Sequence, residues 1–223
     1  MCRSPLERGL LALKSMAATE IALEGASTKS ARTRARILDA SARMLSERGY
    51  AETSLAAIAD AAGLKVGSLY YYFDSKDELI YEVFRLGLTR SFEQVRDAVS
   101  AAGPGASPTQ RLRVAIQAHL ASLHTQGHYS IAGLRIVEQA PEVIRRRQYA
   151  NQRAYGEFWH ELLADAQGAG VIDPAADLIT VRFLLFGAMN SSIDWPRPVR
   201  RNADQVADAI IRLTGFQLAR AGS

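Results

Sequence analysis

Residues 53–79, TSLAAIADAAGLKVGSLYYYFDSKDEL, decide the fold of this chain. The stretch opens with Thr53 and Ser54, whose hydroxyl groups can satisfy the free N–H groups at the start of a helix. Apolar residues then recur at the spacing of a one-sided helix, at Leu55, Ile58, Ala59 and Ala62. Gly63 follows where a helix end favours a left-handed residue. The pattern therefore predicts a short helix that ends at Gly63.

The rest of the stretch predicts a second short helix over about Lys65 to Phe73 and a third that opens at Ser75. Gly67 and Ser68 are small, so the backbone of the second helix can approach a nucleic-acid surface closely. Two short helices joined by a glycine turn are typical of a motif that fits the DNA major groove. The alternative is a helical hairpin buried inside an unrelated bundle.

The stretch closely resembles the TetR family of transcriptional repressors, over about residues 31–91. The positions that carry the resemblance are Ile37-Leu38-Asp39-Ala40-Ser41, Gly49-Tyr50, Thr53, Ile58-Ala59, Ala62-Gly63-Leu64, Gly67 to Phe73 and Ser75 to Leu79. The resemblance implies an all-α fold, with a three-helix helix-turn-helix DNA-binding domain at residues 29–78. Residues 79–223 are then expected to form a helical ligand-binding and dimerisation domain.

Helical patterns run along the whole chain, and no strand signal of any length interrupts them. We expect residues 1–28 to be a largely disordered extension or a misassigned start. Glycine and proline make 101–108 the clearest break between helices. The expected helices outside the motif are 33–48, 75–100, 109–126, 129–139, 141–167, 177–192 and 203–219.

Charge and cysteine content favour a nucleic-acid partner inside the cell. The formal net charge is +4 and the isoelectric point is about 9.4. Lys29, Arg32, Arg34 and Arg36 form a run of cations without an acid, which suits a backbone-binding arm or simply a solvated one. The single cysteine excludes an internal disulfide, and neither an export signal nor a membrane span is recognisable. These features predict a cytoplasmic protein with no membrane partner.

The resemblance also implies which residues contact an operator in double-stranded DNA. Lys65-Val66 stands where the family usually has serine and lysine, so Val66 is expected to meet a thymine methyl group. Tyr70 is expected to be buried, with Tyr71 and Tyr72 facing DNA. The predicted DNA-binding residues are Arg32, Arg34, Thr53, Ser54, Lys65, Val66, Gly67, Ser68, Tyr71, Tyr72 and Lys76. Ordinary solvent exposure is the alternative at each position.

The helix expected over 177–192 is apolar on almost every side, which predicts that it is buried on every side. In TetR-like proteins the last two helices pair with those of a second copy, and a homodimer suits a palindromic operator. The predicted interface residues are Ile179, Phe183, Phe186, Gly187, Val206, Ile210 and Leu213. The alternative is that both helices complete the core of a monomer.

The segment from Leu184 to Pro198 partly resembles TetR regulators that respond to acyl-CoA thioesters in fatty-acid and steroid breakdown. Ser191 and Pro196 replace two aromatic residues of that pattern. The resemblance implies a small apolar effector, whereas the rival is a pocket for a lipophilic, drug-like or cationic compound. The predicted ligand-binding residues are His119, Leu123, Glu138, Tyr155, Phe158, Trp159, Phe186 and Asn190.

No catalytic constellation is recognisable in the sequence. His119 and His124 are five residues apart and share a helix face poorly, so they do not predict a metal site. We expect no catalytic residue, metal or cofactor. The sequence predicts a dimeric, ligand-responsive repressor, and the alternative of another class is an enzyme or ligand-storage protein with an incidental helix-turn-helix.

Overall fold

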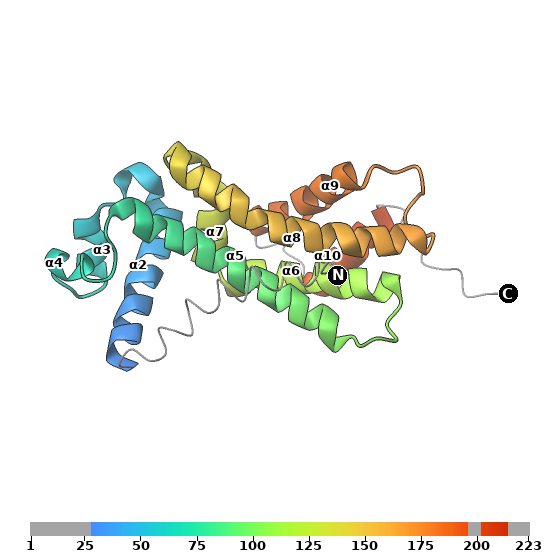
Figure 1. The fold of residues 1–223 in the computed structure, drawn as a ribbon, viewed down its shortest axis with the longest axis horizontal. Helices are drawn as coiled ribbons and strands as arrows, with labels where there is room; N and C mark the ends of the chain where they lie inside the picture. The colour runs from blue at the N-terminus through green and yellow to red at the C-terminus, as the bar shows by residue number, and fades with distance from the viewer. Residues whose placement is uncertain (1–27, 196–201, 214–223) are drawn as a thin grey trace, which may run out of the picture. The chain divides into compact units, whose positions relative to one another are not determined.

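The computed structural model describes residues 28–195 and 202–213, and every regular element within those ranges is a helix (Figure 1). This confirms the all-α class. The main helices are α2 Thr28–Glu52, α3 Leu55–Ala61, α4 Val66–Leu69, α5 Lys76–Ala101, α6 Pro108–Thr125, α7 His128–Ile131, α8 Glu142–Gly168, α9 Leu178–Ser191 and α10 Ala203–Leu213. The predicted N-terminal extension, apart from Thr28, and the predicted helix end beyond Leu213 lie outside the described residues.

Three short elements complete the fold. A π-helical turn, η1 Ala132–Ile136, follows α7 directly and runs into a 3₁₀ turn, η2 Val137–Gln139. Another 3₁₀ turn, η3 Ser192–Asp194, follows α9. The single helix expected over 129–139 is therefore three successive turns of different winding.

The described residues form two compact units. The first contains 28–89 and 126–154, and the second contains 90–125 together with 155–195 and 202–213. The first unit thus adds α7, η1, η2 and the first part of α8 to the three helices expected at 29–78. Helices α5 and α8 each contribute residues to both units.

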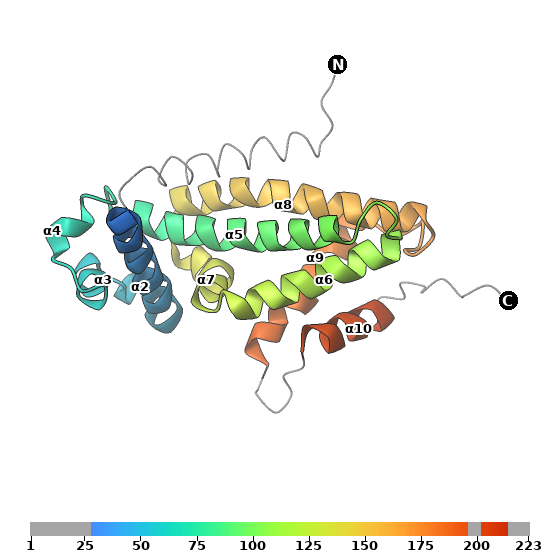
Figure 2. The same cartoon turned by 90° about the horizontal axis from the view of Figure 1, so that it is seen from below.

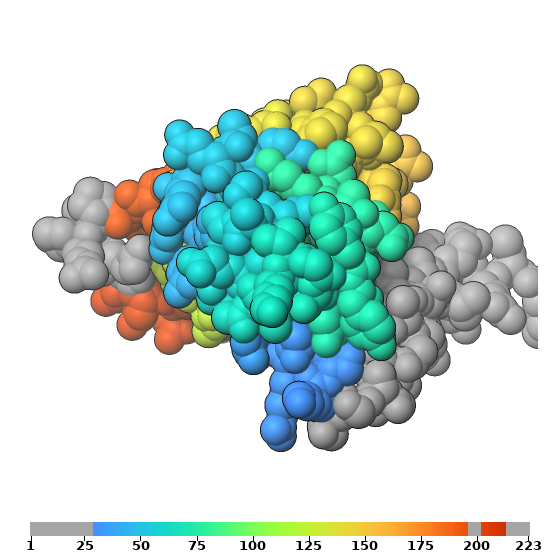
Figure 3. All heavy atoms as spheres, turned by 90° about the vertical axis from the view of Figure 1, so that its left-hand side faces the viewer, coloured from blue at the N-terminus to red at the C-terminus, as the bar shows by residue number. Residues whose placement is uncertain are grey.

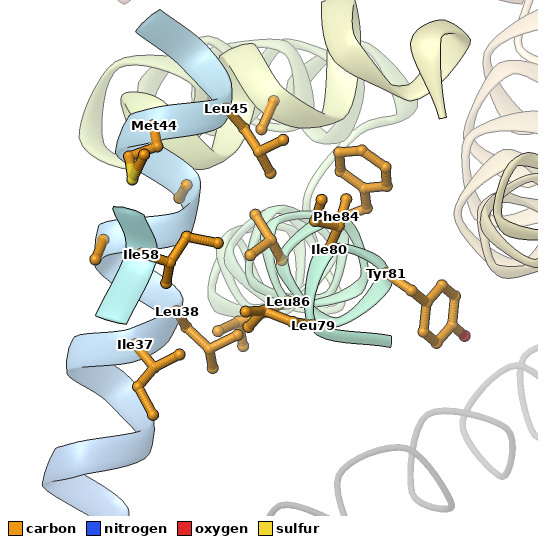
Figure 4. Packing of buried hydrophobic residues seen from close by; sticks show 14 of the residues in the cluster. Ile37, Leu38, Met44, Leu45, Ile58, Leu79, Ile80, Tyr81, Phe84 and Leu86 are labelled. Carbon is orange, nitrogen blue, oxygen red and sulfur yellow. The ribbon is translucent and has the colours of Figure 1, made fainter. Parts of the chain in front are cut away.

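Three helices of the first unit share one hydrophobic core, in which side chains from α2, α3 and α5 converge (Figure 4). The predicted stripe on α2 is fully buried, namely Ile37, Leu38, Ser41, Met44 and Leu45. Ile58 of α3 and Phe84 of α5 are also fully buried in this core. Burying one such large side chain contributes about 1.5–3 kcal/mol, so this core fixes how the helix-turn-helix is held.

Two glycines shape the chain around the motif. Gly63 has a φ of +66°, and the next residue, Leu64, donates its N–H to the carbonyl oxygen of Ala59 at 2.8 Å. This is the predicted left-handed helix end. Gly49 has a φ of +81° and a non-helical backbone, so it breaks α2 where the sequence predicts the helix to end, and a short helical segment follows up to Glu52.

Helix α4 is shorter than the sequence predicts. It ends at Leu69, and the N–H groups of Tyr72 and Phe73 both donate to the Leu69 carbonyl oxygen at 2.9 Å. The residues from Tyr70 to Tyr72 therefore form a turn instead of a further helical turn. Leu69 and Phe73 are both buried and anchor the two ends of that turn.

In the second unit, α10 lies along α6 (Figure 2). Val206 and Ile210 are buried there, and Gln117 of α6 donates to Asp204 of α10 at 2.7 Å. The prediction that Val206 and Ile210 form a dimer interface is therefore wrong, because their amphipathic face is covered within the protomer. The side chain of Leu213 lies outside the described residues.

No helix among residues 28–195 and 202–213 is both long enough and apolar enough to cross a bilayer.

Candidate nucleic-acid interface and effector site

Helix α4 and the turn that follows it expose a row of side chains on one surface of the first unit (Figure 3). Lys65, Gly67 and Ser68 are exposed, as is the apolar side chain of Val66. A Cβ atom added at Gly67 would meet nothing within 4 Å, so the helix surface is open there. This row combines one cation, a hydroxyl group and an apolar group on a short helix.

The three tyrosines after Leu69 divide differently from the prediction. Tyr70 is 56% exposed and Tyr71 is 81% exposed, whereas Tyr72 is half-buried and packs against the core. The expectation that Tyr70 is buried and Tyr72 faces outward is thus wrong. The reason is the turn after Leu69, which directs Tyr70 and Tyr71 to solvent while Leu69 and Phe73 hold the core.

The two hydroxyl residues before α3 have different roles. Ser54 is exposed and caps α3, its Oγ accepting the Ala57 N–H at 3.2 Å. Thr53 is fully buried, and its Oγ1 donates to the carbonyl oxygen of Gly49 at 2.7 Å. The Thr53 side chain is therefore unavailable to a phosphate, which corrects its assignment as a DNA contact.

Lys76 and Tyr50 tie the start of α5 to the end of α2. The Lys76 ammonium donates to the Tyr50 carbonyl oxygen at 2.8 Å and lies 4.2 Å from the centre of the Tyr50 ring. The Tyr50 hydroxyl donates to Asp77, and burial together with that carboxylate raises the pKa of Tyr50. Lys76, predicted as a phosphate contact, is half-buried and serves this internal junction.

The basic run before the motif is also partly internal. Arg34 pairs with Glu82 of α5 at 2.7 Å, and Arg85 pairs with the same carboxylate at 2.7 Å. Burial alone would raise the pKa of Glu82, but the two guanidinium groups lower it. Arg36 donates to the Ala62 carbonyl oxygen at the end of α3, whereas Arg32 is exposed. Arg32 is thus better placed than Arg34 to reach a phosphate.

A second candidate site lies in the other unit, around the buried imidazole of His119 on α6. Its Nδ1 lies 2.8 Å from the Tyr155 hydroxyl of α8, and its Nε2 lies 3.1 Å from Asn190 Oδ1 of α9. Because Asn190 Oδ1 only accepts, His119 Nε2 carries the proton and Tyr155 donates to Nδ1. Three predicted ligand-binding residues from three helices thus form one hydrogen-bonded chain.

Burial keeps this imidazole neutral. Desolvation lowers the pKa of His119 to about 4, although the bond to Asn190 acts in the opposite direction. Burial raises the pKa of Tyr155, so its hydroxyl also stays protonated. The polar centre of the second unit is therefore uncharged near neutral pH.

Aromatic rings surround that polar chain. The Phe186 ring of α9 packs edge-to-face against three rings. Its centre lies 5.3 Å from the ring centres of His119 and Trp159, and 5.7 Å from that of Tyr155. The centre of the Phe92 ring of α5 lies 5.1 Å from the ring centre of Tyr155 and 5.4 Å from that of Phe158. We call His119, Tyr155, Phe158, Trp159, Phe186, Asn190 and Phe92 the aromatic cluster.

Two of the predicted ligand residues fall outside the aromatic cluster, and one member was missed. Glu138 is exposed in the first unit and pairs with Tyr149, so its assignment to the same pocket is wrong. Leu123 is buried on α6, one helical turn after His119. Phe92 was missed, although it lies in the helix expected over 75–100, four residues after the apolar Leu88 and therefore near the same helix face.

Helix α9 also has an exposed apolar face. Phe183 is 66% exposed and Leu184 is 68% exposed; Ile179 and Gly187 are exposed as well. Phe186 was predicted for both the ligand site and the dimer interface, and its ring packs into the aromatic cluster. The apolar residues of α9 therefore lie on two sides of the helix. The inner side carries Phe186, and the outer side carries the exposed Ile179, Phe183 and Leu184.

Within the described ranges, no group of three or more His, Cys, Asp or Glu residues is arranged to hold a metal ion.

Known proteins resemble the chain over both halves. The family described as "Bacterial regulatory proteins, tetR family" matches residues 37–83, and "Tetracyclin repressor-like, C-terminal domain" matches residues 105–215. The repressor KstR2 of Mycobacterium tuberculosis is 27% identical over 169 residues, which cover 74% of this chain and 82% of KstR2.

Solved structures show the same fold. The structure of AibR in complex with isovaleryl coenzyme A and operator DNA is 27% identical, with a TM-score of 0.70 over 81% of this chain and 97% of AibR. The structure of FadR from Bacillus subtilis with stearoyl-CoA is 19% identical, with a TM-score of 0.68 over 80% of this chain and 96% of FadR. Since the two family matches together span more than two thirds of its length, this chain belongs to the TetR family of bacterial transcriptional regulators.

Proposed function

We propose that this TetR-type repressor binds a palindromic operator as a homodimer and leaves it when an acyl-CoA thioester binds. The observation that carries the proposal is the surface of α4, where exposed side chains stand on two buried anchors, Leu69 and Phe73. A rigid helix surface of this kind suits insertion into a major groove.

The exposed residues supply both kinds of DNA contact. The ammonium group of Lys65 at the start of α4 suits a phosphate or a guanine edge. Val66 offers an apolar group to a thymine methyl group, and Ser68 can donate or accept. Tyr70 joins Tyr71 in this set because both are exposed, while Thr53 leaves it.

The outer side of α9 suits a second copy of this chain. Ile179, Phe183 and Leu184 expose large apolar side chains at one end of the helix. Contiguous exposed apolar groups of this size mark interaction surfaces in soluble proteins. A two-fold pairing there would present two copies of α4 to half-sites about one DNA turn, roughly 34 Å, apart.

The effector class follows from the relatives and from the second unit. AibR binds isovaleryl-CoA and B. subtilis FadR binds stearoyl-CoA, as the titles of their structures state. The aromatic cluster offers an apolar, uncharged site to a similar acyl group. A cationic drug is less well matched, because Glu138 is exposed in the first unit rather than in this cluster.

Release requires that the effector prefer the conformation that does not bind DNA, since equal affinity for both conformations would shift nothing. We place this action in the cytoplasm, where the operator lies, and assign the chain no catalytic role because its named relatives are transcriptional regulators.

Fluorescence anisotropy with DNA from upstream of the chain's own gene tests the DNA-binding function. We expect nanomolar-range binding that weakens steeply with salt, and at least about a hundredfold weaker binding to scrambled DNA of the same composition. Equal affinity for both DNAs would contradict operator recognition and favour a non-specific DNA-coating protein. No binding at all would favour an enzyme or ligand-storage protein.

A further inference from the structure

The aromatic cluster contains one hydrogen-bond donor that the protein does not use. The indole Nε1 of Trp159 is buried, with its residue 0% exposed, and has no hydrogen-bond partner among the described residues. It lies near enough to the Tyr155 hydroxyl to lower the pKa of that group, against the larger effect of burial, but outside hydrogen-bond geometry. A buried donor without an acceptor is unfavourable.

No neighbouring polar group accepts from this indole in hydrogen-bond geometry; the nearest acceptor is the oxygen of the Tyr155 hydroxyl, which donates its own proton to His119. His119 donates from Nε2 to Asn190 and accepts from Tyr155 at Nδ1, so both of its nitrogen atoms are engaged. The Ser192 hydroxyl, in η3 directly after α9, is also buried without a partner among the residues described. Trp159 Nε1 and Ser192 Oγ are thus two of the buried polar atoms of the second unit that have no hydrogen-bond partner among the described residues.

The ring of Phe186 closes this site. It lies 5.3 Å from the Trp159 ring and 5.3 Å from the His119 ring, and it is only half-buried. Phe186 is therefore the ring of the cluster that a rotamer change can most readily move away from Trp159 and His119.

We propose that the effector displaces the Phe186 ring and places a neutral oxygen acceptor on the indole N–H of Trp159. This inference rests on the proposed function, because it assumes that the acyl-CoA effector binds in the second unit. The acceptor is uncharged because the surrounding groups are aromatic or neutral, and burial of a charge beside the neutral imidazole would be unfavourable. The ligand class is an apolar acyl group with one deeply buried carbonyl or hydroxyl oxygen.

Two sources could provide that oxygen, the thioester carbonyl group or an oxygen on the acyl chain. Three probes distinguish these two sources. All three have the same straight carbon chain, of the length between four and eighteen carbons that releases the operator best. They are the acyl-CoA itself, the alkyl-CoA thioether without a carbonyl group, and the same thioether with one ketone placed in turn along its chain.

Nuclear magnetic resonance of the ¹⁵N-labelled indole groups reads the contact directly on the intact protein. The chain has two tryptophans, so the Trp195→Phe variant leaves Trp159 as the single indole signal. We expect the Trp159 indole proton to shift downfield with the acyl-CoA or with a ketone-bearing thioether, and not with the plain thioether. The same shift with all three probes, or no shift with any, would overturn the proposal.

The Trp159→Phe variant tests the same contact by affinity, since it keeps an aromatic ring but removes the donor. We expect about tenfold weaker binding of the oxygen-bearing probe and unchanged binding of the plain thioether. Trp195→Phe serves as the control and should bind both probes as the unaltered protein does. Equal weakening for both probes would show that Trp159 contacts the ligand through its ring and not through its N–H group, and would overturn the proposal.

Failure of this inference differs from failure of the proposed effector. If acyl-CoA releases the operator but Trp159 shows no oxygen-dependent response, only the inference is wrong. If no acyl-CoA of any tested length binds or releases the operator, both the effector class and the inference are wrong.

Discussion

The side-chain oxygen Oε1 of Gln139 accepts a hydrogen bond from the backbone N–H of Tyr50 at 3.1 Å. This bond joins η2 to the break in α2 within the first unit, and the Tyr50 carbonyl oxygen accepts from Lys76 of α5. His128 Nδ1 lies 2.6 Å from the Ser46 hydroxyl, and the Tyr129 hydroxyl donates to Asp39. Residues 126–154 therefore hold the helix that precedes the DNA-reading motif.

Gln139→Ala should weaken this junction modestly. We expect a loss of about 0.5–1.5 kcal/mol in the free energy of unfolding, because the amide is near the surface and water can replace the lost acceptor. Operator affinity should fall a few-fold, because α2 and the motif are less well positioned. Denaturant melts and DNA titrations measure the two effects.

Gln167→Ala is the matched control for that variant. Its amide donates to three backbone carbonyl groups in the second unit, including that of Ala176 at 3.0 Å. It should lower stability without lowering operator affinity. A similar loss of operator affinity in both variants would contradict a specific role for Gln139.

Lys65→Ala and Tyr71→Ala should each reduce operator affinity by at least about tenfold and leave the melting temperature unchanged, since both side chains are exposed. Lys65→Ala should also reduce the slope of log affinity against log salt by about 1, if the ammonium group neutralises one phosphate. Leu69→Ala is the contrast, because truncation of this buried anchor should cost about 2–5 kcal/mol of stability. Unchanged affinity in both surface variants would contradict the assignment of α4.

Phe183→Glu should convert the proposed dimer to a monomer, because it places a charge in the apolar outer face of α9. Sedimentation equilibrium measures the change, and operator affinity should fall with it because one protomer engages one half-site. Ser100→Glu, at an exposed position of α5, should leave the assembly unchanged. A dimer that survives Phe183→Glu with unaltered affinity would place the interface elsewhere.

His119 should make stability depend on pH. The pKa of the buried imidazole is about 4, below its ordinary value of about 6.5, so unfolding takes up a proton between these values. The free energy of unfolding should therefore fall as the pH drops from about 6.5 towards 4, by up to about 3 kcal/mol.

The His119→Gln variant isolates this contribution from those of the carboxylates. The imidazole contacts Tyr155, Asn190, Phe186 and Trp159, and none of these groups titrates in that range. The difference in unfolding free energy between the unaltered protein and the variant should narrow as the pH falls. A difference that is constant from pH 7 to pH 4 would contradict a buried neutral His119.

Periodicity predicted the parts of the fold that local sequence determines. The stripe on α2 and the end of α3 at Gly63 follow from residue spacing and from the conformational range of glycine. Tyr70 was misplaced because its burial was carried over from the family pattern, whereas in this chain α4 ends after Leu69 and the following turn exposes Tyr70.

The second unit shows what sequence patterns leave open. The amphipathic face of α10 looks the same whether α6 or a second copy covers it, so Val206 and Ile210 were assigned to the wrong partner. Glu138 was placed in the pocket as an acid that suits a cationic ligand, although it lies in the other unit. The hydrogen bonds of His119 join residues on three different helices, and a local sequence pattern cannot predict such a contact.

Titration of acyl-CoA into the preformed complex of protein and labelled operator DNA tests the central claim most directly. With straight-chain acyl-CoAs of four to eighteen carbons, we predict that anisotropy falls to the value of free DNA for at least one chain length, and that free coenzyme A and the matching fatty acid leave it bound. Full retention of the operator at saturating concentrations of every acyl-CoA, by protein that binds this DNA specifically, would contradict the account.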